Sequence, residues 1–485
     1  MSFSTQVGRS AIWAIIGQGT TAVLSLVNFA VVGRFVSPNE YGSFLLAMMV
    51  LTATQWLALN AYKEPVVQAK DLGDSLVNSV FTFTVGVGAL LCCIMLGAAW
   101  YLERGGSTPG VGACIVVLAL KLVIDTAMSV PNALRVRKLE FKFLARVSIC
   151  ANIAATVVNV SLLLAGWGLL SLVLSQMVAS LLTAGALLYT GQQRYRLRLR
   201  RADLAVLGGY SPHVILWQGL EALGQTVDRY FIASRLTLTD LGLYGFGKRL
   251  NDVIIEVLVG ATSNVSLPAF SQMQNDRARL QAAFLKAVRL VTLMVLPVIA
   301  ALWVTADDFV PLLFGPKWSG AVPVYRWFLL LGIIQTIGIL QGGLLRSMWK
   351  PGVWTRYQVM QAVANVVVLS IVAGHSIDVI AAAIVIRAYV LWGWVVYQVC
   401  KALEMRFGFY LLQLAKPVSL ALTAAAAGYA MRHYVAADWN LLLRLVVCGA
   451  VVVGVFGALV MALFRSAAAE LLGLVKGIIS RGKKA

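Results

Sequence analysis

Long apolar runs alternate with short polar segments along almost the whole chain. Stretches of about 20 mostly apolar residues, the length that crosses a bilayer as a helix, begin near Ala11, Tyr41, Ser75, Val111, Leu144, Gly168, Leu207, Leu241, Phe284, Ala321, Val353, Asp378, Leu411 and Asn440. The pattern predicts an all-α membrane protein with about 14 transmembrane helices. The segments between these runs are short, so no separate soluble domain is expected.

The polar segments alternate in charge. Lysine and arginine collect in every second segment, as at 63–70, 135–142, 194–201 and 346–356, whereas the segments between them carry few cations. Because basic loops remain on the cytoplasmic side of a membrane, the alternation predicts that both termini are cytoplasmic.

The chain repeats itself at an offset of 200 residues, without a gap. The recurring pairs are Gln18-Gly19 with Gln218-Gly219, Asn28 with Asp228, Ser37 with Thr237, Glu40 with Asp240, Gly42 with Gly242, and Phe44 with Tyr244. An even number of crossings separates the two copies, so they run in the same direction. The repeat predicts two six-helix bundles related by a pseudo-two-fold axis along the membrane normal.

The repeat and the charged segments together divide the chain into five predicted parts. Residues 1–193 form an N-terminal six-helix lobe and 207–402 a C-terminal six-helix lobe. Between them lies a basic cytoplasmic linker, 194–206, whose arginines we expect to contact anionic lipid. Residues 403–464 add two transmembrane helices, and 465–485 form a basic amphipathic tail on the cytoplasmic membrane surface.

Composition excludes a soluble protein. Hydrophobic residues make up 60% of the chain and charged residues 12%, against about half and about a quarter in soluble domains. The net charge of +20 is what basic cytoplasmic loops produce, so we expect no nucleic-acid partner. No HExxH, Walker or GxSxG motif occurs, and the histidines and cysteines lack the spacing of a metal site. We therefore expect no enzyme and no cofactor, apart from a coupling proton or Na⁺.

Ionisable side chains inside the predicted spans are the candidate functional residues. Each costs about 2.5–3.5 kcal/mol at a helix centre, so it normally faces a partner or a wet cavity. They concentrate in the seventh and eighth spans, and one more lies deep in the twelfth. The cations are Arg229, Lys248, Arg249 and Arg387, and the carboxylates are Glu221, Asp228, Asp252 and Glu256. The cations are candidates to bind a phosphate or pyrophosphate, and the carboxylates to carry a coupling ion or to form charge pairs.

A structural interpretation stays open for these charges. Lys248 and Asp252 are four residues apart, so they could equally form an ion pair that holds two helices in register. Lys121 and Asp125 have the same spacing and are interpreted as a structural pair. Arg326 and Arg444 show no partner in the sequence, and we expect them to extend toward the outer membrane interface.

Motifs across most of the chain point to a family. They are Ser37-Pro38-Asn39-Glu40-Tyr41-Gly42, Leu134 to Phe141, Gly166-Trp167-Gly168, Asp228-Arg229-Tyr230, Leu241-Gly242-Leu243-Tyr244, Leu267-Pro268-Ala269-Phe270-Ser271, and Leu312 to Trp318. In their order and spacing, the chain resembles the polysaccharide transporter branch of the multidrug/oligosaccharidyl-lipid/polysaccharide (MOP) exporter superfamily, which includes Wzx-type flippases. The resemblance implies two bundles opening as a V, with spans one, two, seven and eight lining a central cationic cavity.

The resemblance also implies a function. A flippase of this kind moves an oligosaccharide repeat unit, linked to undecaprenyl pyrophosphate, across the bacterial cytoplasmic (inner) membrane for exopolysaccharide, capsule or O-antigen assembly. The expected mechanism is alternating access, and the expected partners are membrane lipids, a polymerase and other polysaccharide assembly proteins. Three alternatives stay open: export of another lipid or a drug, a membrane polymerase or glycosyltransferase, and a scaffold of a biosynthetic complex.

Overall fold

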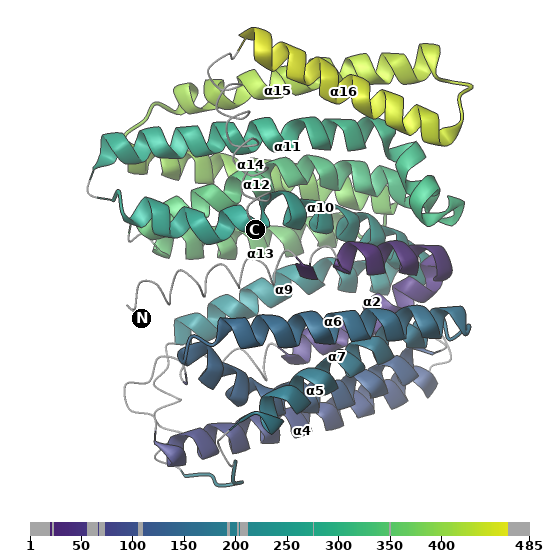
Figure 1. Ribbon diagram of the computed structural model, residues 1–485, viewed down its shortest axis with the longest axis vertical. Coiled ribbons are helices and arrows are strands. Elements are labelled where there is room, and N and C mark those ends of the chain that lie inside the picture. The colour runs from purple at the N-terminus through teal and green to yellow at the C-terminus, as the bar shows by residue number, and fades with distance from the viewer. Residues whose placement is uncertain are drawn as a thin grey trace. The chain divides into compact units, whose positions relative to one another are not determined.

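The computed structural model describes residues 20–21, 24–55, 66, 73–104, 110–191, 195–200, 203, 212–274, 276–348 and 351–463. All regular elements in these ranges are helices (Figure 1). They are a first helix at Leu24–Phe35, α2 (Pro38–Gln55), α4 (Asp74–Arg104), α5 (Val111–Arg137), α6 (Phe141–Leu164), α7 (Leu169–Tyr189), α9 (Pro212–Arg235), α10 (Leu238–Ser271), α11 (Arg277–Phe314), η2 (Pro316–Ala321), α12 (Val322–Ser347), α13 (Pro351–Val372), α14 (Ile377–Leu403), α15 (Phe407–Ala430), η3 (Met431–Val435) and α16 (Leu441–Leu463).

Within the described residues, the predicted spans coincide with helices, which confirms the all-helical membrane fold. The predicted starts near Ala11 and Leu207 lie outside the described residues. Nine helical segments within the described residues are long and apolar enough to cross a bilayer: α4, α5, α6, α7, α11, η2 with α12, α14, α15 with η3, and α16. The chain is thus a multi-pass membrane protein, and most of its candidate charges lie on α9 and α10.

The longest helix, α11, shows how local sequence sets the ends of a span. Its first turn is capped by the Asp276 carboxylate, which accepts a hydrogen bond from the Arg279 backbone N–H at 3.0 Å. It ends where Gly315 adopts a φ of 98°, a conformation that suits glycine because it has no Cβ. Over these 38 residues the helix places Asp307 and Asp308 close to its C-terminal end.

The chain forms two compact units. The first comprises Met1–Phe246 and Gln358–Ile380, and the second comprises Gly247–Tyr357 and Ala381–Ala485. In the first unit, α2, α4 and α5 meet around a core that includes Leu51, Met95 and Ile115. In the second, α11, α12, α14 and α15 share a core around Phe284 and Leu344.

Helices α15 and α16 pack beside α11 within the second unit (Figure 1). Their contact is an apolar cluster that includes Val304, Ala424, Val452 and Phe456, all of them buried. The two helices that lie outside the sequence repeat are therefore an integral part of the second unit.

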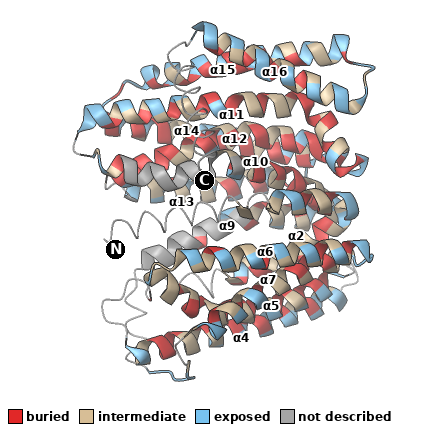
Figure 2. Cartoon of the chain, in the orientation of Figure 1, coloured by how far each residue is buried: buried red, intermediate tan, exposed pale blue. Residues whose placement is uncertain are grey.

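Large apolar side chains remain exposed along the outward faces of several helices. Examples are Leu90, Ile94 and Trp100 on α4 and Val157 on α6, and the exposed residues run along these helices in Figure 2. Such surfaces suit contact with lipid tails, which are as apolar as leucine.

The described part of the linker, residues 195–200, is held along α4 by its backbone. Arg196 N–H donates to Asn78 Oδ1 at 2.9 Å, and Arg198 N–H donates to Thr82 Oγ1 at 2.9 Å. The Tyr195 ring also stacks on Phe81, with 4.7 Å between ring centroids. The linker therefore has a protein contact in addition to the lipid contact that the sequence predicts. The predicted tail, 465–485, lies outside the described residues.

Candidate functional site

The two copies of the repeat each begin a helix with the same capping arrangement. Before α2, the Ser37 hydroxyl and backbone N–H both donate to Glu40 Oε2 at 2.8 Å. Before α10, the Thr237 hydroxyl and backbone N–H donate to Asp240 Oδ2 at 2.6 and 3.2 Å. Each acidic residue's N–H in turn donates to the hydroxyl. These are capping boxes, which satisfy backbone donors at a helix start.

The starts of α2 and α10 cross at two glycines. A Cβ on Gly42 would overlap the carbonyl oxygen of Leu238, and a Cβ on Gly242 would overlap that of Pro38. The Asn39 amide also donates to Thr239 Oγ1 at 3.4 Å, across a separation of 200 residues. Reciprocal contacts of this kind are those that a two-fold relation between two copies produces, and they explain why both copies need glycine here.

Asp228 is built into the packing of the repeat. It is 2% exposed, and its Oδ2 accepts a hydrogen bond from the Tyr244 hydroxyl at 2.8 Å, which ties α9 to α10. In the first copy the corresponding residues are Asn28 and Phe44, so this bond cannot form there. Asn28 Oδ1 accepts instead from Asn159 Nδ2 at 2.7 Å. Whether Asp228 carries a coupling ion or forms a charge pair stays a prediction.

The candidate cations are placed in different surroundings. Lys248 and Arg249 are half-buried on α10, ten residues after its start at Leu238, which is about 15 Å along the helix axis. Arg229, on α9, has a buried Nε with no hydrogen-bond partner among the described residues, and Arg387 is half-buried on α14. Asp252 is half-buried and Glu256 is exposed, whereas the Glu221 side chain lies outside the described residues. A shared role for these residues remains a prediction.

A network of charges that the sequence interpretation missed joins α11 to the last two helices. Asp308 is fully buried; its Oδ2 accepts from Arg432 Nε and its Oδ1 from Arg444 Nε, both at 2.9 Å. Asp307 binds Arg432 at 2.8 Å and Arg326 at 2.7 Å.

The sequence showed no partner for Arg326 or Arg444, and the structure supplies one, because both form ion pairs with α11. Their extension toward the outer membrane interface stays a prediction. A signal for this was present in the sequence. Two adjacent carboxylates at the end of an apolar run require cations nearby.

Asp125 joins three helices of the first unit. Its carboxylate binds Lys121 Nζ at 2.5 Å on the same helix, and it accepts hydrogen bonds from Gln55 Nε2 on α2 at 3.0 Å and Ser180 Oγ on α7 at 2.7 Å. The interpretation of Lys121 and Asp125 as a structural pair agrees with these contacts.

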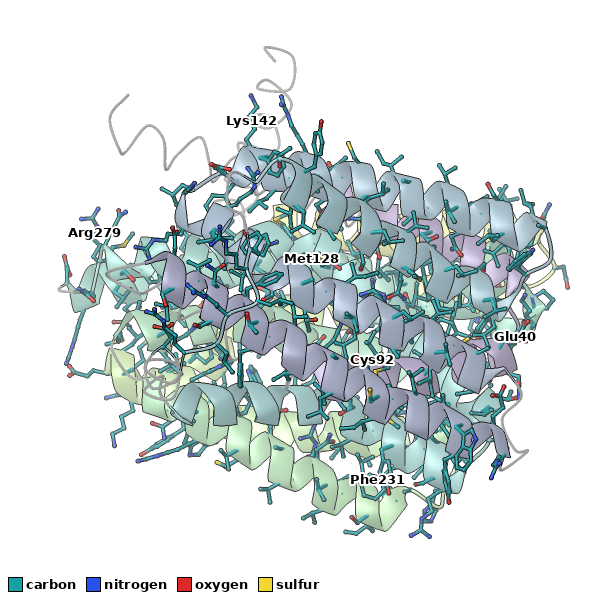
Figure 3. All side chains as sticks on the ribbon, turned by 90° about the horizontal axis from the view of Figure 1, so that it is seen from below. Glu40, Cys92, Met128, Lys142, Phe231 and Arg279 are labelled. Atoms are coloured by element: carbon teal, nitrogen blue, oxygen red, sulfur yellow. The ribbon has the colours of Figure 1, made fainter. Side chains whose placement is uncertain are left out.

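A polar cavity opens beside this pair, between α5, α6 and α7. Its volume is about 460 Å³, and its lining includes Lys121, Asn132, Asn152, Gln176 and Thr183. A second cavity of about 200 Å³ extends toward the first helix and shares Asn152, Gln176 and Ala179 with the larger one. Met128, which lines the larger cavity, lies between Lys142 and Glu40 in the view of Figure 3.

The fold is that of known membrane transporters. The lipid II flippase MurJ, in an inward closed conformation, matches with a TM-score of 0.73 at 12% identity, over 93% of this chain and 99% of that one. An inward-facing multidrug resistance MATE family transporter of the MOP superfamily matches with a TM-score of 0.58 at 15% identity, over 81% of this chain and 99% of that one. At such identities the likeness concerns the fold alone.

Sequence comparison adds the family. The family model described as "Polysaccharide biosynthesis protein" matches residues 31–323, which is more than half of the chain, so the chain belongs to this family. The succinoglycan biosynthesis transport protein ExoT of Rhizobium meliloti is 24% identical, over 97% of this chain and 96% of its own. The lipopolysaccharide biosynthesis protein WzxC of Escherichia coli is 22% identical over 74% of each chain. These findings confirm the resemblance inferred from the motifs.

Proposed function

We propose that this protein is a flippase for a lipid-linked oligosaccharide, carried on undecaprenyl pyrophosphate, in a bacterial cytoplasmic membrane. The observation that carries the proposal is the similarity along 97% of the chain to a succinoglycan transport protein. The match to a lipid II flippase across 93% of the chain shows that a fold of the required kind is present. The product would feed exopolysaccharide, capsule or O-antigen assembly, with a polymerase as a downstream partner.

The physical problem is the passage of a charged, hydroxyl-rich head group through hydrocarbon. Buried polar groups without partners cost several kcal/mol each in such a medium. A protein path removes this cost if it supplies cations for the pyrophosphate and hydrogen-bonding groups for the sugars. Lys248 and Arg249 are the proposed pyrophosphate ligands, because they are adjacent, half-buried and well inside α10. Arg229 is a further candidate, since its buried Nε has no hydrogen-bond partner among the described residues, and Arg387 is another because it lies deep in a predicted span.

The proposed cycle is alternating access. The two six-helix bundles rock about the repeat axis, the head group crosses between them, and the lipid tail remains in the bilayer. Transport breaks no covalent bond, so no catalytic residue is assigned. The sequence holds no Walker motif, and net direction would come from a coupled proton or Na⁺ gradient or from consumption of the product outside. Both termini are placed in the cytoplasm, on the strength of the alternation of basic loops.

The test is transport by the purified full-length protein in vesicles that contain a lipid-linked oligosaccharide. Transport no faster than in protein-free vesicles would reject the function. The site is tested with the Lys248→Ala/Arg249→Ala double variant, which should slow transport at least tenfold. The control is Lys401→Ala/Arg406→Ala, which removes the same charge from two exposed positions. Equal transport by the two double variants would reject the site and leave the function standing.

A further inference from the structure

The two cavities of the first unit adjoin each other, because Asn152, Gln176 and Ala179 line both. Together they are called the polar pocket. The larger part alone has a volume of about 460 Å³, within the range of about 300–1,000 Å³ that is usual for small-molecule sites. Ser25 and Asn28 of the first helix line the smaller part, and so does Thr21. The polar pocket lies within one unit, and none of its lining residues belongs to the proposed pyrophosphate site.

The amide groups of this pocket retain hydrogen-bonding capacity. Asn152 Nδ2 donates to the Ser148 carbonyl oxygen of its own helix at 2.8 Å, which leaves its Oδ1 available. Gln176 Nε2 contacts only the Met48 sulfur, at 3.7 Å. In the described part of the chain, no hydrogen bond engages Gln176 Oε1 or the Asn132 amide. These three side chains are half-buried, so their amide groups are accessible from the pocket, and the pocket suits a ligand rich in donors and acceptors.

The charge of the pocket limits the class of ligand. Its lining contains one ionisable side chain, Lys121, and the Lys121 ammonium is bound to Asp125 at 2.5 Å. The Asp125 carboxylate also accepts from Gln55 and Ser180. A metal cation would require carboxylate or carbonyl oxygens free to bind it, and a pyrophosphate would require more than one cation. A neutral, hydroxyl-rich group needs neither, and it can bond to the amides both as donors and as acceptors.

The pocket lies at about the middle of the membrane-spanning helices. Asn152 is the twelfth of the 24 residues of α6, and Gln176 is the eighth of the 21 residues of α7. The sugars of a lipid-linked oligosaccharide would therefore meet the pocket as they cross the bilayer.

We infer that this pocket, centred on Asn152 and Gln176, binds a neutral sugar residue of the transported oligosaccharide. The inference rests on the proposed function and deepens it. Lys248 and Arg249 recognise the pyrophosphate that all such cargo shares, whereas the amide pocket recognises the sugar that distinguishes one cargo from another. The apolar C–H face of a sugar ring would pack on Ala151 and Ala179, and the sugar hydroxyls would form hydrogen bonds with the Asn152 and Gln176 amides.

The experiment measures two ligands separately on the full-length protein in lipid nanodiscs. One is the water-soluble oligosaccharide released by mild acid hydrolysis from the lipid-linked precursor. The other is undecaprenyl pyrophosphate without sugar. The Asn152→Ala/Gln176→Ala variant should bind the released oligosaccharide about tenfold more weakly or worse, since each amide makes more than one hydrogen bond. Its affinity for undecaprenyl pyrophosphate should be unchanged.

A second variant acts by volume and leaves the polar groups in place. Ala179→Leu fills the junction of the two cavities and should abolish binding of the released oligosaccharide. Its matched control is Gly185→Leu on the same helix, where an added Cβ meets nothing within 4 Å. For the amide variant, the control is Ser161→Ala, at an exposed position of α6. Both controls should bind the oligosaccharide like the wild type.

The outcomes separate this inference from the proposed function. Two results would overturn the inference that this pocket binds a sugar. One is that the wild type does not bind the released oligosaccharide. The other is that the wild type, the amide variant and Ala179→Leu bind it equally. Failure of the wild type to move the lipid-linked precursor in vesicles would overturn the flippase function alone. Loss of sugar binding in both variants, with undecaprenyl pyrophosphate still bound, supports the inference.

Discussion

The buried carboxylate of Asp308 should be essential for the docking of α15 and α16. The Arg432 and Arg444 guanidiniums each donate to a different oxygen of this carboxylate, both at 2.9 Å. In Asp308→Asn the side chain keeps its shape but loses its charge, so one guanidinium keeps only a neutral oxygen acceptor and the other faces the amide NH2 group. Removal of one partner from a buried ion pair costs about 3–5 kcal/mol. Because Arg432 retains Asp307 at 2.8 Å, we expect a loss near the lower end, about 3 kcal/mol.

The neighbouring carboxylate is a matched control. The Asp307 side chain is 39% exposed, whereas that of Asp308 is 0% exposed, so Asp307→Asn should cost only about 0–1 kcal/mol. Thermal unfolding of the full-length protein in detergent, followed by tryptophan fluorescence, gives the order of stability. Combining Asp308→Asn with Arg444→Gln should cost less than the sum of the two single changes, because the residues share one interaction. Equal melting temperatures for Asp308→Asn and Asp307→Asn would refute the argument.

Two further predictions concern the crossing of α2 and α10. Gly242→Ala should destabilise the protein by about 1–3 kcal/mol, the usual cost of overpacking, because the new Cβ overlaps a carbonyl oxygen. The control is Gly86→Ala, where a Cβ meets open space and the melting temperature should stay unchanged or rise. An equal loss of stability in both variants would contradict the steric argument. Tyr244→Phe should cost about 1.5–3 kcal/mol, because it removes the hydrogen bond that the Tyr244 hydroxyl donates to the buried Asp228 carboxylate. Adding Asp228→Asn recreates the Asn28 and Phe44 pairing of the first copy and should restore part of the loss in the same melting assay; a purely additive double variant would show that the two side chains do not interact.

The sequence by itself determined the elements that depend on local pattern. Apolar runs long enough to cross a bilayer located the nine membrane-spanning segments found among the described residues, because burial in lipid selects for continuous hydrophobicity whatever the neighbouring helices are. The offset of 200 residues identified Gly42 and Gly242 as equivalent, and the capping residues Glu40 and Asp240 follow from a motif only four residues long. The Lys121 and Asp125 pair was also accessible, since a helix brings residues four apart onto one face.

Tertiary structure alone decided which distant groups meet. Asp308 pairs with residues 124 and 136 positions away, and Asn28 pairs with Asn159 across 131 positions; no local periodicity encodes such separations. The same is true of the pocket around Asn152 and Gln176. Each of these amides looks like an isolated polar residue in an apolar run, and only the packing of α5, α6 and α7 turns them toward one cavity. Hydrophobicity fixes where a helix must lie, but a hydrogen bond requires a partner within about 3 Å, and only the folded chain supplies one.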